Sequence, residues 1–314
     1  MDPFHATRQF HDPDEAARAI SGTWLEISVL GPASGAWSIT DVCDEGCRLV
    51  YGRMASPFSG CGAILRDSMI LCWPMGDDTG EWSINGRRIL GDTLMRLESG
   101  VEYATLTSRP LHWAALVVPH IDHEGPSAFG ARDIERDAMA RIRGITRTAV
   151  HLARTDPPSS KRVLAALAAT VGSLASPGQF AHSPHGERDI GKLIALLQSQ
   201  RTEPLHPGGL ARLAGVDERT LRRAFASRFG ISVGRYLRLR RLNDVRRDLM
   251  SLASAPASVT QAATKHGFFD LGRFAANYRR TFGENPSTTL SRTRRALRIA
   301  RIAADRSAPG TPSS

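Results

Sequence analysis

Arginine clusters twice near the C-terminal end of this 314-residue chain, each time in a segment with the same layout. The first segment, residues 217–230, reads DERTLRRAFASRFG, and the second, residues 270–283, reads DLGRFAANYRRTFG. Guanidinium groups bind phosphate oxygens and can donate two parallel hydrogen bonds to one guanine. The residue types therefore predict that both segments contact nucleic acid.

The spacing within each segment predicts a short amphipathic helix. The aspartate at its start can accept hydrogen bonds from the first backbone N–H groups, and the glycine at its end can terminate the helix. Every fourth position between them is apolar or aromatic, which gives one buried stripe per helix. The outward positions are Arg219, Thr220, Arg222 and Arg223 in the first segment, and Leu271, Gly272, Arg273, Ala276, Arg279 and Arg280 in the second. We predict that these residues bind DNA.

A second short helix is expected before each segment, in GGLARLAGV and in VTQAATKH. Small residues and a glycine at the turn let two helices meet closely, as in a helix-turn-helix unit, whose second helix enters the major groove. A longer helix, from about residue 233 to 252, would hold the two units one helical turn of DNA apart. Its arginines contact phosphates or form a solvated face, and the sequence leaves both interpretations open.

Charge is distributed unevenly along the chain. Residues 188–301 contain 23 Lys and Arg against 8 Asp and Glu, whereas the whole chain contains 41 and 31. This excess predicts a partner with phosphate groups, either nucleic acid or an anionic membrane surface. A membrane-bound protein would need one basic amphipathic helix with a lipid-facing side, and only the tail after residue 290 suits that role. The helix-turn-helix pattern favours DNA.

The remaining bulk features are typical of a cytoplasmic protein. We find no apolar stretch long enough to span a membrane, and the N-terminus MDPFHATRQF lacks the pattern of a secretory signal. The four cysteines are unevenly spaced, as expected for reduced thiols rather than for a disulfide framework.

Residues from about 188 to 290 resemble the AraC/XylS transcriptional regulators. The matching strings are LARLAGVDERTLRRAFASRFG, YLRLRRLNDVRRDL and HGFFDLGRFAANYRRTFGENPSTTL, the last resembling most the branch that includes the ethanolamine-operon activator EutR. The resemblance implies two helix-turn-helix units joined by a helix, activation of transcription with RNA polymerase as a partner, and no enzymatic activity or cofactor. It also implies base contacts from the exposed first-turn positions of both second helices. In this sequence those positions are Arg219, Arg222, Arg223, Leu271, Gly272, Arg273 and Ala276.

Two departures from the family pattern bear on these contacts. Asp217 replaces the serine or threonine that is common there, which keeps the cap but adds a negative charge near DNA. Gly272 and Ala276 are short, so we expect the second unit to contribute less direct base contact than the first.

The N-terminal half is predicted to be a β domain. Between residues 23 and 119, short runs such as Leu25, Ile27 and Val29 alternate with polar residues, and Asn85-Gly86 marks a hairpin. Many short strands without helices between them indicate an antiparallel barrel or sandwich. Two amphipathic helices follow within residues 133–175, and they either form a dimer surface or pack on their own β domain. The expected fold class is thus α+β with two domains, a β-rich cupin-like domain and an all-α domain of two helix-turn-helix units.

The family usually places a sensing or dimerising domain in this position, so we expect an unknown small-molecule effector and allow for a homodimer. An apolar ligand pocket could be lined by Trp24, Trp37, Trp73, Trp82 and Trp113, although tryptophans that fill the barrel core are the commoner case. No metal site is expected in the N-terminal domain, because the histidines within residues 1–123 are scattered. These are His5, His11, His112, His120 and His123.

Two functional alternatives remain at this stage. A zinc-thiolate regulator that repairs methylated DNA needs four converging cysteines, but this chain offers one C-x3-C pair, Cys43 and Cys47, and isolated Cys61 and Cys72. A ligand-independent repressor would have the same DNA-binding domain. The predicted division is 1–122 for the sensing or dimerisation domain, 123–187 for a helical connector and linker, 188–290 for the DNA-binding domain and 291–314 for a basic, partly disordered tail.

Overall fold

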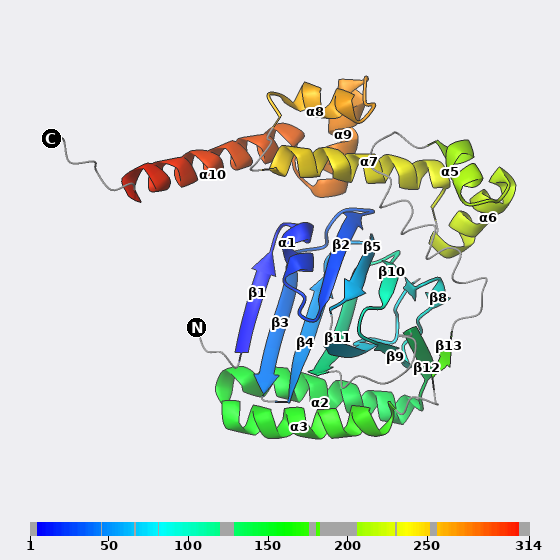
Figure 1. Ribbon diagram of the computed structural model, residues 1–314, viewed down its shortest axis with the longest axis vertical. Coiled ribbons are helices and arrows are strands. Elements are labelled where there is room, and N and C mark those ends of the chain that lie inside the picture. Colours follow the sequence, from blue (N-terminus) through cyan, green and yellow to red (C-terminus); the bar gives the residue numbers. More distant parts are fainter. Residues whose placement is uncertain are drawn as a thin grey trace.

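The computed structural model describes residues 5–44, 46–65, 67–80, 82–119, 129–175, 180–182, 206–229, 231–251 and 256–307. Figure 1 shows a β-rich part made by the N-terminal half, two long helices on one side of it and the C-terminal helices on the other. The predicted order of a β domain followed by an α domain is confirmed. The first part of the predicted DNA-binding domain, residues 188–205, lies outside the described residues.

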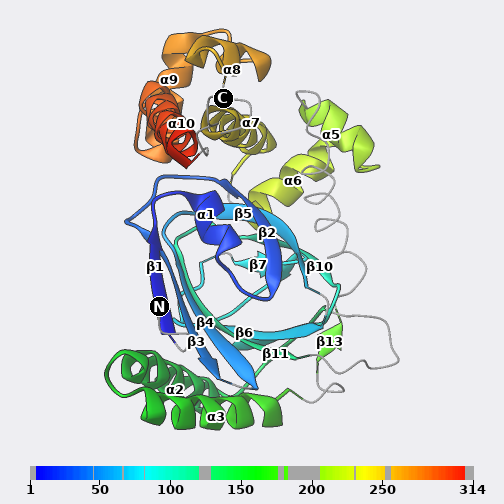
Figure 2. The ribbon, with the colours of Figure 1, turned by 60° about the vertical axis from the view of Figure 1, so that its left-hand side comes forward.

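Two antiparallel sheets face each other and enclose a barrel-like core (Figure 2). The larger sheet has the order β1 (His5–Phe10), β3 (Trp37–Asp44), β4 (Cys47–Met54), β11 (Leu111–Pro119), β6 (Ser68–Pro74), β9 (Thr93–Leu97), β12 (Phe129–Asp133), β13 (Ala181–His182). The smaller sheet has the order β2 (Thr23–Val29), β5 (Phe58–Ile64), β10 (Glu102–Leu106), β7 (Ser83–Ile84), β8 (Arg87–Arg88). A short helix, α1 (Pro13–Arg18), lies between β1 and β2 in the chain. The predicted hairpin is confirmed, with Asn85 and Gly86 at φ values of 50° and 81°.

Helices α2 (Arg136–Thr155) and α3 (Pro157–Ser173) pack on the outer face of the larger sheet. Neighbouring strand residues point to opposite faces, so that Val50 joins the core between the sheets while Leu49 joins the core beneath the two helices. Of the two alternatives for residues 133–175, the helices therefore pack on their own β domain. The expected connector is thus part of the β-rich unit.

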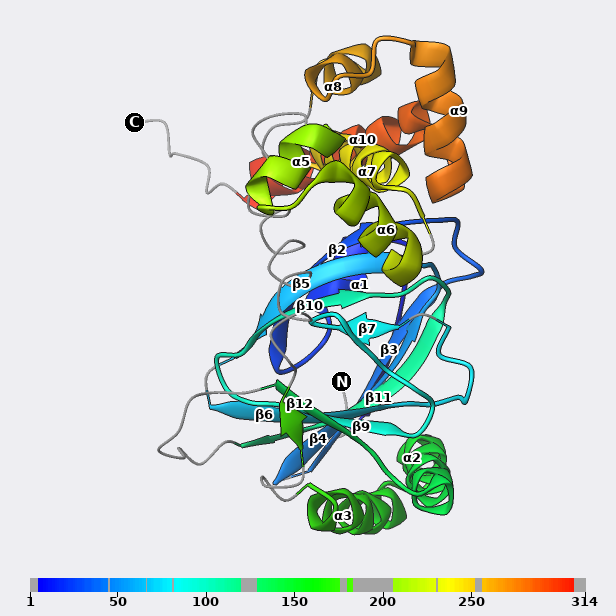
Figure 3. The ribbon, with the colours of Figure 1, turned by 90° about the vertical axis from the view of Figure 1, so that its right-hand side faces the viewer.

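The C-terminal helices form two helix-turn-helix units joined by a long helix (Figure 3). The helices are α5 (Pro207–Leu213), α6 (Glu218–Phe229), α7 (Val233–Met250), α8 (Val259–Lys265), α9 (Leu271–Phe282) and α10 (Pro286–Ser307). Helix α10 runs across the predicted boundary at residue 290, and its Leu290 and Thr293 are buried. The folded helical part therefore extends into the segment that the sequence suggested was a tail.

The barrel and α7 are joined by polar contacts along the free edge of β2. The amide of Asn243 accepts a hydrogen bond from Val29 N–H at 2.8 Å and donates one to Val29 O at 2.9 Å. Arg247 donates to Ile27 O at 2.9 Å and pairs with Glu26 at 3.3 Å. Asn243 thus occupies the place of a neighbouring strand at this edge.

Candidate nucleic-acid interface

The start of α6 is fixed by Asp217. Its Oδ1 accepts a hydrogen bond from Thr220 N–H at 2.8 Å, and its Oδ2 accepts one from the Thr220 hydroxyl at 2.7 Å. These hydrogen bonds lower the pKa of the Asp217 carboxyl, so it is ionised near neutral pH. The predicted cap is confirmed, and Thr220, predicted to contact DNA, uses its hydroxyl in that cap.

The start of α9 is built in the same way. Asp270 Oδ1 accepts a hydrogen bond from Arg273 N–H at 2.9 Å, and α9 ends at Gly283, whose φ is 76°. Only a residue without Cβ adopts this left-handed conformation easily, so glycine terminates the helix as the sequence predicts. The turns before both helices also use left-handed glycines, Gly215 and Gly267.

Burial divides each helix into an inner and an outer face. The stripe residues Leu221, Phe225, Phe274 and Tyr278 are buried in the helical core, while Phe282 is half-buried. Apart from half-buried Thr220, the residues predicted to contact DNA are exposed. They are Arg219, Arg222, Arg223, Leu271, Gly272, Arg273, Ala276, Arg279 and Arg280.

A carboxylate that the sequence analysis missed lies beside these arginines. Glu218 Oε2 accepts a hydrogen bond from Arg222 Nη2 at 2.7 Å, one helical turn away. Both side chains are exposed, so the pair contributes little stability. Its effect is to hold the Arg222 guanidinium along the outer face of α6. The i,i+4 spacing of glutamate and arginine was the available signal.

An exposed aromatic residue precedes α9. Phe269 is 81% exposed, and Leu271, two residues further along the chain, is 38% exposed. The adjacent Phe268 instead packs on Phe274, with ring centroids 5.2 Å apart. Because Phe268 already covers the start of α9, Phe269 is not needed for that packing. In the sequence, the available signal was the pair of consecutive phenylalanines at one turn, since only one of them can cover the helix start.

The arginines of α7 divide between two environments. Arg235 and Arg238 are exposed, whereas Arg246 and Arg247 contact other parts of the protein. Arg246 lies over the ring of Phe282 at 4.9 Å and pairs with Asp12 of the barrel at 3.7 Å. The sequence allowed the α7 arginines either to contact phosphates or to form a solvated face. Arg246 and Arg247 do neither, because both connect α7 to the barrel.

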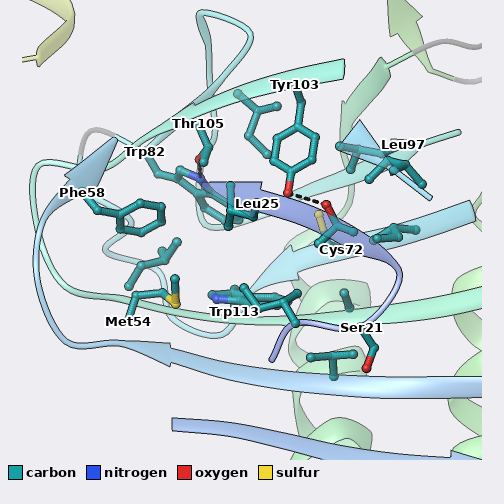
Figure 4. A pocket seen from close by; sticks show the side chains of 18 residues that line it. Ser21, Leu25, Met54, Phe58, Cys72, Trp82, Leu97, Tyr103, Thr105 and Trp113 are labelled. Atoms are coloured by element: carbon teal, nitrogen blue, oxygen red, sulfur yellow. Dashed lines mark hydrogen bonds between the residues drawn. The ribbon is translucent and has the colours of Figure 1, made fainter. Parts of the chain in front are cut away.

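The five tryptophans do not form one site. Trp82 and Trp113 line an apolar cavity between the two sheets (Figure 4). Trp37 and Trp73 are fully buried in two different cores, and Trp24 is 56% exposed on the surface. The structure therefore separates Trp24, Trp37 and Trp73 from the predicted pocket, because residue type alone does not reveal the direction of a side chain.

The four cysteines do not converge either. Cys72 faces the core between the sheets, Cys61 packs against the helical core, and Cys43 and Cys47 lie on the β3–β4 hairpin. Burial raises the pKa of all four thiols, which keeps them protonated. Within the described ranges no group of three or more His, Cys, Asp or Glu side chains is arranged to hold a metal ion. This arrangement speaks against the zinc-thiolate alternative.

Comparisons with known proteins concern mainly the C-terminal part. Residues 210–292 match the family model of a helix-turn-helix domain. Over 107 residues the chain is 44% identical to XylDLEGF operon transcriptional activator 1 of Pseudomonas putida, covering 34% of this chain and 32% of that protein. Over 97 residues it is 36% identical to the probable thc operon regulatory protein of Rhodococcus erythropolis, covering 31% and 29%. The chain thus spans about a third of the length of these curated relatives.

A solved structure is also similar in sequence. It is a probable AraC family transcriptional regulator from Rhodopseudomonas palustris CGA009, with 34% identity, a TM-score of 0.30, and coverage of 32% of this chain and 93% of that one. The matched relatives and the family model confirm the AraC/XylS resemblance for the helix-turn-helix domain. The narrower resemblance to the ethanolamine-operon branch, like the cupin-like character of the barrel, stays a prediction. Among the helices that the structure describes, none has the length and apolarity required to cross a membrane.

Proposed function

We propose that this chain is a sequence-specific DNA-binding transcriptional regulator whose helices α6 and α9 enter successive major-groove faces. The observation that carries the proposal is the repeated layout of two capped helices on one core, each with an exposed, arginine-bearing outer face. A helix fits the major groove, where arginine can bond guanine O6 and N7.

The two helices differ in the chemistry that they offer to the bases. Helix α6 presents Arg219, Arg222 and Arg223, which suits guanine. The start of α9 presents Phe269 and Leu271, whose apolar surfaces suit the methyl group of thymine. We infer that α6 recognises guanine and that the start of α9 recognises thymine, with Arg279 and Arg280 near the end of α9 bonding phosphates.

The rest of the proposal follows the resemblance to operon activators. The β-rich part binds a small effector in the cavity of Figure 4, and the regulator activates transcription together with RNA polymerase. It acts in the cytoplasm, has no catalytic activity of its own, and has a second copy of the chain as a further partner.

The test is selection of bound fragments from sheared genomic DNA by the purified full chain, followed by gel shifts with the enriched fragment and with a shuffled version. We expect the enriched fragment to keep an advantage of at least about a thousandfold at physiological salt, as specific DNA binders do. Equal affinity for both fragments, lost in parallel as salt rises, would show a basic protein without sequence recognition.

A further inference from the structure

We propose that the cavity between the two sheets binds a compact, uncharged and predominantly apolar molecule of about the size of one substituted ring. The inference rests on the proposed function, because it names the class of effector that the β-rich part would take. It follows from the lining of the cavity, the pairing of its polar groups and its size.

The lining is apolar almost throughout. Leu25, Phe58, Leu97 and Trp113 are among the side chains that point into the cavity (Figure 4). Among the described residues that line it, no Asp, Glu, Lys, Arg or His occurs. A carboxylate or an ammonium group would lose its hydration here without gaining a charged partner, which is costly.

Four polar side chains of the lining are already paired with one another. The Thr23 and Tyr103 hydroxyls are 2.8 Å apart, and Trp82 Nε1–H donates to Thr105 Oγ1 at 3.1 Å. Burial raises the pKa of the Tyr103 hydroxyl and raises that of the Cys72 thiol to about 12, so both groups stay protonated near neutral pH. A sugar would have to break these pairs to bind its own hydroxyls, so several hydroxyl groups are disfavoured.

The size of the cavity limits the ligand further. The cavity has a volume of about 80 Å³, counted as the space that the centre of a water molecule can occupy. One water needs roughly 10–15 Å³ on this scale, so the space accepts roughly five to eight such spheres. This corresponds to a single ring with a small substituent.

Strand β2 connects the cavity to the DNA-binding helices. Its Thr23 and Leu25 line the cavity, while Ile27 and Val29 bond Arg247 and Asn243 of α7 through their backbone groups. A ligand that displaces Leu25 therefore moves β2. Because α7, the helix between the two helix-turn-helix units, is hydrogen-bonded to β2, it moves as well. We infer that filling the cavity changes the affinity for DNA.

The experiment titrates the full chain with toluene, benzoate and glucose, following tryptophan fluorescence and the thermal midpoint. Trp82 and Trp113 report directly from the lining. We expect toluene to saturate the signal and raise the midpoint, and benzoate to bind at least about tenfold more weakly because its carboxylate would be buried unpaired. Equal binding of benzoate and toluene, or no response to toluene, would overturn the ligand class.

Two variants locate the site. Ala115→Leu adds volume inside the cavity and should weaken toluene binding at least about tenfold, whereas Leu97→Ala enlarges it and should favour naphthalene over toluene. Trp24→Phe, on the exposed surface, is the matched control and should bind toluene as the parent does. Near-UV circular dichroism confirms folding of each variant. Unchanged toluene binding in both folded cavity variants contradicts the site.

A gel shift on the same samples tests the proposed ligand class and the proposed DNA-binding function separately. Sequence-specific DNA binding without any response to toluene overturns the ligand class alone. Toluene binding without sequence-specific DNA binding overturns the proposed function alone. Toluene binding that leaves DNA affinity unchanged contradicts the connection through β2.

Discussion

Replacing Asn243 by alanine is expected to uncouple the barrel from the helical part. The Asn243 side chain bonds both backbone groups of Val29, which is 3% exposed, and donates a third hydrogen bond to Leu239 O at 2.8 Å. Each buried polar group left without a partner costs about 1–3 kcal/mol. Leaving both the N–H and the C=O of Val29 unpaired would therefore lower the free energy of unfolding by about 2–6 kcal/mol. Because water can enter at the strand edge and bond these groups, we expect a loss in the lower half of that range.

The placement of tryptophan makes this loss measurable. All five tryptophans lie in residues 24–113, so their fluorescence reports the barrel, while circular dichroism at the helix band also reports the C-terminal helices. In urea, the unchanged protein should give coincident transitions by both signals. Asn243→Ala should separate the two midpoints, because the barrel and the helical part then unfold independently.

Asn277→Ala is the matched control. Asn277 is half-buried on α9 and its side chain accepts a hydrogen bond from Arg280 at 3.3 Å, away from the barrel. We expect this variant to keep coincident transitions. The reasoning would be refuted if Asn243→Ala also kept coincident transitions and lost less than about 1 kcal/mol, the net worth of one ordinary hydrogen bond.

Three further predictions concern the DNA-binding surface. Arg222→Ala should weaken binding to a selected operator by about 1–3 kcal/mol in anisotropy titrations, and Arg273→Ala should weaken it by less. A larger loss for Arg273→Ala would contradict the expectation that α6 contributes more direct base contact than α9. Phe269→Ala should reduce the preference for thymine over uracil at one operator position without lowering the thermal midpoint of the protein. Phe269→Leu, which keeps an apolar side chain, should restore part of that preference. Asp217→Asn should keep the cap and tighten DNA binding by removing a negative charge, whereas Asp217→Ala should lower the urea midpoint; equal midpoints would argue against the cap.

Local patterns in the sequence were sufficient for much of the fold. The alternation around Leu25 and Ile27 predicted β2, and Asn85-Gly86 predicted the hairpin. The repeated layout of the two arginine segments predicted α6 and α9 with their N-terminal aspartate caps. Each of these features depends on residues within one or two turns or strands. The exposed faces of both helices followed directly from the buried stripe.

Features that depend on distant partners were not predictable in this way. Strand β5 reads FSGCGAI and shows little alternation, because a Cβ at Gly60 or Gly62 would collide with the backbone of β2. Asn243 looks like an ordinary polar residue of α7, and its partner Val29 is 214 residues away in the chain. The basic composition of α10 resembles a tail, although Leu290 anchors it in the helical core.

The central claim, that α6 and α9 recognise bases in two successive major-groove faces, is tested most directly by interference footprinting on a selected operator. Methylation of guanine N7 should block binding in one cluster of positions, and replacement of thymine by uracil should weaken it in a second cluster about 10 base pairs away. The first cluster should lose its interference in Arg222→Ala, and the second in Phe269→Ala. Interference confined to a single cluster, or clusters unchanged by both substitutions, would contradict the account.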